Sequence, residues 1–296
     1  MKKLILDDVS VECLVESAGK SFHPEFLFPD FDSSKISEHE HWLLPRFIDH
    51  NSGRLLMSIH TYIIRTPDYI CLVDTCVGNC KQRPSTPAWN DRRGPWLQNL
   101  KSLGIAPEDV DYVVCTHLHV DHVGWNTVFH NGVWVPTFPK ARYLFHRIEY
   151  EFWQANSSLE PGARSGANDE CFADSITPVV EAGQAVLVEG DHIIDRRLCF
   201  EASPGHTPGH ICLSLQSGGK DIAFTGDLMH HPVQVACPDW NSRFCVDPEL
   251  ARDSRYAYLH DCAEKEKLVL AAHFASPTLG KVVPERKGFR FAAVDE

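Results

Sequence analysis

Short apolar stretches recur along the chain, and several of them end at a histidine or an aspartate. Residues 111–116 form such a stretch and run directly into His117, and residues 268–272 run into His273. A helix is predicted before the first of these stretches, over about residues 94–103. Strands that alternate with helices predict an α/β fold built in layers. Ligands in such folds tend to bind at the carboxyl ends of strands, so we expect function at these polar positions.

Other segments fit the same alternation. Residues 59–76 read as two strands around a turn, residues 141–154 as a strand and then a helix, and residues 186–229 as several strands. Asp247 as N-cap and Pro248 at the first helical position predict a helix to about residue 265. No low-complexity tract or linker divides the 296 residues. We therefore expect one domain over residues 1–296, with residues 20–55 as a flap or a contact between two copies.

Charge and cysteine content exclude several classes. The chain has 28 Lys and Arg against 40 Asp and Glu, a formal charge of −12, which argues against a nucleic-acid or anionic-membrane surface. Its 11 cysteines form no Cys-x-x-Cys pair, so we expect reduced thiols in a cytoplasmic protein. Asp7 and Asp8 interrupt the start of the chain, which is not typical of a signal peptide. No run reaches the roughly 18 to 20 apolar residues of a membrane helix.

The densest polar cluster is His117-Leu118-His119-Val120-Asp121-His122, directly after a predicted strand. In an extended segment His117 and His119 point to one side, and a turn after Val120 brings Asp121 and His122 round the same centre. Four side chains that can bind a metal therefore arise within six residues. The alternative is a polar loop with incidental histidines.

Three further candidates each follow an apolar strand. They are His206 in Gly-His-Thr-Pro-Gly-His, Asp227 in a Gly-Asp pair, and His273. Alone, a histidine after a strand is more often a satisfied loop or core residue, and Gly-Asp is commonly a turn. Together with the first cluster these residues supply a complete ligand set for metal ions.

In these residues, together with Asp74 in Leu-Val-Asp-Thr, the sequence resembles the metallo-β-lactamase superfamily. The resemblance implies an α/β fold, a four-layer αββα sandwich of the metallo-β-lactamase type, with two metal ions at one edge of the sheets. It implies that His117, His119 and His206 hold the first metal, that Asp121, His122 and His273 hold the second, and that Asp227 bridges them. The complete set is similar to the lactonase, glyoxalase-type and organophosphate-hydrolase branches.

The chemistry of these ligands is consistent with that implication. Imidazole and carboxylate groups suit Zn²⁺, although Mn²⁺ or Fe²⁺ can occupy such sites. Two cations that share a water lower its pKa toward about 7, from about 15.7 in bulk, and so produce hydroxide at neutral pH. Asp121 can bind metal and also move a proton near the leaving group. Asp74 either orients a ligand histidine or simply forms a turn.

Trp125, His230 and His231 are the candidate substrate contacts. Trp125 lies next to the ligand cluster, and the two histidines follow Asp227. Packing under a loop for the tryptophan, and a solvated turn for the histidines, are the alternatives. Signal-lactone hydrolases usually carry a tyrosine after the bridging aspartate. None is present here, and the stretch looks more like the methyl-parathion-hydrolase branch.

We therefore predict a cytoplasmic, dinuclear, metal-dependent hydrolase, most simply a zinc enzyme. It would use a bridging hydroxide to open a lactone or cleave an ester in a small, partly apolar substrate, with no nucleic-acid or membrane partner and with homodimerisation as a possibility. The alternatives are a phosphotriester or thioester hydrolase, a di-iron redox protein, a nuclease, and a metal-binding module without turnover.

Overall fold

The computed structural model describes residues 3–160, 171–286 and 288–294. The chain divides into two compact units. Residues 2–16 and 59–189 form what we call the first unit, and residues 17–58 and 190–296 form most of the second. Each unit has a mixed α/β organisation and a hydrophobic core of its own.

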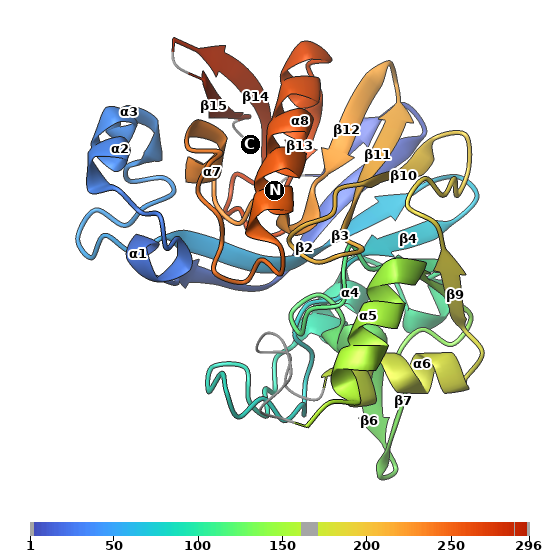
Figure 1. Ribbon diagram of the computed structural model, residues 1–296. Coiled ribbons are helices and arrows are strands. Elements are labelled where there is room, and N and C mark those ends of the chain that lie inside the picture. Colours follow the sequence, from blue (N-terminus) through green and yellow to red (C-terminus); the bar gives the residue numbers. More distant parts are fainter. Residues whose placement is uncertain (1–2, 161–170, 287, 295–296) are drawn as a thin grey trace. The chain divides into compact units, whose positions relative to one another are not determined.

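A seven-stranded sheet, in the order β1-β2-β3-β4-β5-β8-β9, organises the first unit. Its strands are β1 (Leu4–Leu6), β2 (Val9–Lys20), β3 (Leu56–Arg65), β4 (Ile70–Val73), β5 (Tyr112–Val114), β8 (Arg142–His146) and β9 (Ala185–Val188). Of these strands, β2, β3, β4 and β9 are labelled in Figure 1. The pairs β4 with β5, β5 with β8 and β8 with β9 are parallel. The segments that follow β4 and β5 therefore begin at the same edge of the sheet.

The helices of the first unit are α4 (Trp96–Ser102), α5 (Arg147–Ser157) and α6 (Thr177–Glu181), and a separate hairpin joins β6 (Thr127–His130) to β7 (Val133–Pro136). α4 and α5 send Trp96, Leu100 and Trp153 into the core. There they meet strand residues such as Val113 and Tyr143. Burial of these large side chains is the main source of stability for the unit.

The second unit contains a six-stranded sheet in the order β10 to β15. Its strands are β10 (Leu198–Ala202), β11 (Ile211–Ser217), β12 (Lys220–Phe224), β13 (Leu268–Leu270), β14 (Leu279–Glu285) and β15 (Gly288–Ala293). β10, β11 and β12 are successively antiparallel, and β12 is parallel to β13. The carboxyl ends of β10, β12 and β13 therefore lie at the same edge.

The helices of this unit are α1 (Pro24–Leu27), α2 (Ser33–Glu38), α3 (Glu40–Leu43), α7 (Val233–Ala236) and α8 (Pro248–Glu264). α1 to α3 belong to residues 20–55, and Leu27, Phe28 and Phe47 from that segment are buried in the core of the unit. The segment is thus a packed part of the second unit. A role for it as a flap or in a dimer stays a prediction.

The expected fold class and most expected elements are confirmed. The strands around residues 59–76, the helix near residue 100 and the strand after residue 111 are present. α8 begins at Pro248, and Oδ1 of its N-cap Asp247 accepts a hydrogen bond from the Leu250 N–H at 3.0 Å. Among the residues that the structure describes, no helix is both long and apolar enough to span a bilayer.

Candidate metal centre

Parallel strands bring Asp74 and the His117–His122 cluster to one edge of the first unit's sheet. Val73 and Val114 are paired in register, and Asp74 follows the first strand while Thr116 and His117 follow the second. The Asp74 N–H donates to the Val114 carbonyl at 2.9 Å. Asp74 adopts a left-handed backbone conformation, with φ of 57°, which aspartate tolerates better than most residues. We call His117, His119, Asp121 and His122 the first half-site.

The Asp74 carboxylate is buried and accepts three hydrogen bonds, two from Thr116 and one from His122. Its Oδ1 receives the Thr116 N–H at 2.8 Å, and its Oδ2 receives the Thr116 hydroxyl at 2.9 Å and Nδ1 of His122 at 2.8 Å. The Thr116 hydroxyl also lies 3.1 Å from Nδ1 of His117. Asp74 therefore orients His122 directly and His117 through Thr116, an arrangement typical of the partners behind metal-binding histidines.

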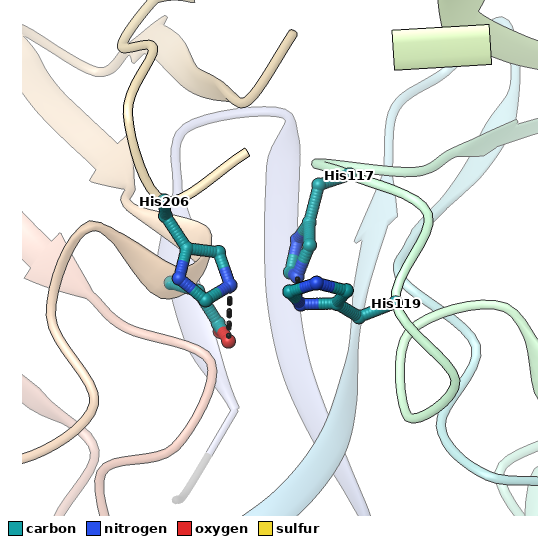
Figure 2. Close-up of side chains that lie close together, drawn as sticks. His117, His119 and His206 are labelled. Atoms are coloured by element: carbon teal, nitrogen blue, oxygen red, sulfur yellow. Dashed lines mark hydrogen bonds and ion pairs between the residues drawn. The ribbon is translucent and has the colours of Figure 1, made fainter. Parts of the chain in front are cut away.

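His117 and His119 of the first half-site lie side by side in Figure 2. Nε2 of His117 is 2.9 Å from Nδ1 of His119, and the ring centres of His117 and His122 are 4.0 Å apart. The His122 N–H donates to the His119 carbonyl at 3.0 Å, which is the expected turn. Oδ1 of Asp121 lies 3.8 Å from Nε2 of His122.

Close backbone contacts hold this loop in place. The Thr75 N–H donates to the His122 carbonyl at 2.7 Å, and the Gly124 N–H donates to the Cys76 carbonyl at 2.7 Å. A Cβ at Gly124 would lie 1.8 Å from the Val77 carbonyl oxygen, so the two segments meet at a distance that only glycine allows. The half-site therefore rests on a loop with little freedom to move.

Helix α5 supports the same loop from a second direction. The buried Glu149 carboxylate accepts the Leu118 N–H at 2.9 Å and the indole N–H of Trp153 at 2.7 Å. The Trp153 ring packs edge-on against His119, with ring centres 5.2 Å apart. No local pattern predicts these roles, because Glu149 and Trp153 resemble ordinary residues of an amphipathic helix.

The second unit brings together His206, Asp227 and His273, which we call the second half-site. Phe224 and Leu270 are paired in register on parallel strands, and Asp227 and His273 each follow three residues later. Nε2 of His273 is 3.1 Å from Oδ1 of Asp227. Nε2 of His206 is 3.4 Å from Oδ2 of Asp227, the contact drawn as a dashed line at His206 in Figure 2. All three side chains are buried.

Two positioning contacts fix this half-site. Nδ1 of His273 lies 3.0 Å from the Ser58 carbonyl oxygen, so Nδ1 donates and Nε2 is left facing Asp227. Nε2 of His210 accepts the Asp227 backbone N–H at 3.0 Å, while Nδ1 of His210 lies 2.8 Å from the Ser203 hydroxyl. His210 is the second histidine of the Gly-His-Thr-Pro-Gly-His motif, and its position in the motif alone does not predict this contact.

The two histidines after Asp227 have different surroundings. Nε2 of His230 is 3.3 Å from Oδ2 of Asp227, and its ring lies 4.9 Å from that of His206, so His230 belongs beside the second half-site. His231 is fully buried, and its Nε2 donates to the Phe47 carbonyl at 2.8 Å. Burial lowers the pKa of His231 to about 4. This packing does not support His231 as a substrate contact: it is a neutral core residue beneath residues 20–55.

Trp125 is likewise packed inside the first unit. It is 3% exposed and stacks on Trp96, with ring centres 5.3 Å apart. Its indole N–H donates to Oε1 of Glu16 at 2.7 Å. The Glu16 carboxylate also accepts the N–H groups of Val77 and Gly78 at 3.1 Å and lies 4.0 Å from the Arg92 guanidinium. Burial raises the pKa of Glu16. Packing, which was the alternative interpretation of Trp125, therefore fits the structure better than a substrate contact.

The donors in both half-sites suit a metal ion. Their histidines and aspartates all belong to groups of side chains that could hold a metal ion. They offer imidazole nitrogen and carboxylate oxygen, the donor set that Zn²⁺ and other borderline divalent metals prefer.

Comparison with known proteins identifies the family. The sequence pattern of the metallo-beta-lactamase superfamily matches residues 55–273. The chain belongs to the metallo-beta-lactamase superfamily. An N-acyl homoserine lactonase from a Bacillus species is 30% identical over 195 residues, 63% of this chain and 65% of that protein. A metallo-beta-lactamase domain-containing protein 1 from Xenopus laevis is 30% identical over 175 residues, 57% of this chain and 60% of that protein. The chain thus spans somewhat less than two thirds of these relatives.

Solved structures show the same fold. The hydrolase AbOPH of the beta-lactamase superfamily matches with a TM-score of 0.82 at 24% identity, over 99% of this chain and 97% of that one. AidC, a dizinc quorum-quenching lactonase solved with its product N-hexnoyl-L-homoserine, matches with a TM-score of 0.76 at 21% identity, over 100% of this chain and 97% of that one. At these identities the likeness establishes the metallo-β-lactamase fold.

Proposed function

We propose that the two half-sites together bind two divalent metal ions, most simply Zn²⁺, and that the protein is a metal-dependent hydrolase. In this proposal the first ion takes His117, His119 and His206, and the second takes Asp121, His122 and His273. Asp227 bridges the two ions. The dizinc lactonase of the same fold supports the number and kind of ions.

The orientation of the imidazoles carries the proposal. Nδ1 of His117 is held by the Thr116 hydroxyl, Nδ1 of His122 by Asp74, and Nδ1 of His273 by the Ser58 carbonyl. A neutral imidazole that donates from Nδ1 keeps its lone pair on Nε2, the form in which it binds a metal. Three buried histidines prepared in the same tautomer favour a ligand role over incidental packing.

When bound, two divalent ions would polarise an ester carbonyl and lower the pKa of a shared water toward about 7. The protein's own part is to fix the ligands and to move protons. Asp121 is proposed to take up and return a proton near the leaving group. Its side chain is 13% exposed, whereas that of the neighbouring His122 is 2% exposed.

The proposed substrate is a small, partly apolar lactone or ester. The N-acyl homoserine lactonases among the relatives support this class, at about 28–30% identity. His230 is the proposed substrate contact, because its ring lies beside Asp227. Its backbone N–H donates to Oε1 of Gln234 at 2.6 Å, which fixes the position of the residue. A cytoplasmic location and a homodimer stay predictions.

Removal and restoration of metal tests the proposal. The purified protein is dialysed against a chelator, assayed on lactones, aryl esters, thioesters and phosphotriesters, and assayed again after Zn²⁺, Mn²⁺ or Fe²⁺ is returned. We expect activity on lactones or esters that disappears with the metal and returns with it. Full activity in protein shown by elemental analysis to be metal-free would contradict the mechanism. A preference for phosphotriesters or thioesters would replace the substrate class but keep the metal centre.

A further inference from the structure

The loop that carries His206 is fastened to the segment that leads into α8. The Val246 N–H donates to the His206 carbonyl at 2.9 Å, and the Asp247 N–H donates to the Gly205 carbonyl at 2.9 Å. These two adjacent backbone hydrogen bonds fix the position of the loop relative to the start of α8. Since Asp247 is also the N-cap of α8, the helix and the loop share one anchor.

The first turns of α8 also contact the loop that carries His206. The Ser254 hydroxyl donates to the Pro204 carbonyl at 2.6 Å. Gly205 has a φ of +127°, and a Cβ there would lie 2.1 Å from the backbone nitrogen of Ala251. The loop therefore touches the helix backbone directly, and His206 has a fixed base from which its ring projects.

The ring of His206 meets different groups at its two nitrogens. Nε2 faces Oδ2 of Asp227 at 3.4 Å. Nδ1 faces Sγ of Cys245 at 3.7 Å, within hydrogen-bond distance for sulfur. Cys245 immediately precedes Val246, so the backbone bonds that hold the loop also hold the thiol against the imidazole.

We propose that Cys245 is a positioning residue for His206, with its sulfur accepting the Nδ1 hydrogen so that Nε2 is presented to a metal ion. The inference rests on the proposed metal centre. It gives His206 the same arrangement that Thr116 gives to His117, Asp74 to His122 and the Ser58 carbonyl to His273. Sulfur is a weak acceptor, so its contribution is orientation and tautomer more than added basicity of the ring.

Two substitutions of Cys245 distinguish a role as hydrogen-bond acceptor from a role in packing alone. Cys245→Ser keeps a group that accepts the Nδ1 hydrogen, whereas Cys245→Val fills a similar volume without one. Cys199→Val is the matched control, because Cys199 is half-buried like Cys245 and lies on β10 in the same unit. Metal affinity is measured by chelator competition on the full chain, and the visible spectrum of the cobalt-substituted protein reports the ligand geometry. Melting of the metal-free variants shows that each one folds.

We expect Cys245→Val to weaken the binding of one of the two ions by about tenfold and to change the cobalt spectrum. Cys245→Ser should retain more of the affinity, and Cys199→Val should match the parent protein. Parent-like affinity and spectrum in Cys245→Val would overturn the inference, because packing alone would then suffice. A thiolate-to-cobalt charge-transfer band in the parent protein would also overturn it, by making Cys245 a direct ligand. A parent protein that binds no metal would instead refute the proposed function itself.

Discussion

Replacing Asp74 by asparagine tests how the first half-site is built. The carboxylate accepts from the Thr116 N–H, the Thr116 hydroxyl and Nδ1 of His122 at 2.8 to 2.9 Å. An amide of the same shape has one acceptor oxygen and one NH₂ donor. With the NH₂ facing His122, the imidazole is driven to the tautomer with its hydrogen on Nε2, the atom proposed to bind the metal.

The magnitude follows from the groups involved. Loss of a partner behind a metal ligand typically costs about 10–100-fold in metal affinity, or about 1.4 to 2.8 kcal/mol. A buried donor left without an acceptor costs about 1–3 kcal/mol of folding stability. We therefore expect Asp74→Asn to weaken metal binding within that range and to lower the stability of the metal-free protein as well.

Affinity is measured by competition with a chromophoric chelator, and stability by urea unfolding of the metal-free protein. Asp111→Asn is the control: this aspartate also accepts a backbone N–H, that of Ile70 at 2.9 Å, but it precedes β5, whereas the proposed ligand histidines follow that strand in the chain. The control should lose some stability and keep its metal affinity. If the Asp74→Asn protein binds metal as tightly as the parent, Asp74 does not set the tautomer of His122.

Three further outcomes are expected. Asp227→Ala should bind fewer than two ions per chain by elemental analysis, and two tightly held ions would show that the bridge is assigned wrongly. Thr116→Val should lower metal affinity by roughly tenfold, less than Asp74→Asn, because the backbone N–H still reaches Asp74; a larger loss in chelator competition would speak against this ranking. The pKa of His231 is about 4 when folded and about 6.5 when unfolded, so the unfolded chain binds the proton first. Stability should therefore fall by up to about 3 kcal/mol as the pH drops from about 6.5 to 4, and His231→Asn should flatten this fall in urea titrations; an unchanged slope would contradict it.

The sequence predicted the fold class and the ligand candidates because both depend on local patterns. Strand periodicity and the N-cap at Asp247 can be recognised within a few residues, and so can the His117–His122 cluster. Parallel pairing of β4 with β5 and of β12 with β13 then accounts for why residues after different strands meet within each unit.

The supporting contacts could not be predicted, because they join residues that are far apart in the chain. The indole N–H of Trp125 donates to Glu16, 109 positions away in the chain. This contact holds Trp125 inside the first unit, although its place in the sequence suggests a pocket residue. His231 donates a hydrogen bond to the carbonyl of Phe47, 184 positions away in the chain. This contact places His231 in the core, whereas its neighbour His230 lies beside Asp227. Side-chain type alone does not show which of two adjacent histidines faces a site and which faces the core.

Anomalous diffraction from crystals of the metal-loaded protein would locate the ions and the residues that bind them. We predict two peaks about 3.5–4 Å apart, with Asp227 between them and ligands from both half-sites around them. A single peak, or two peaks bound by residues of one half-site alone, would contradict this prediction.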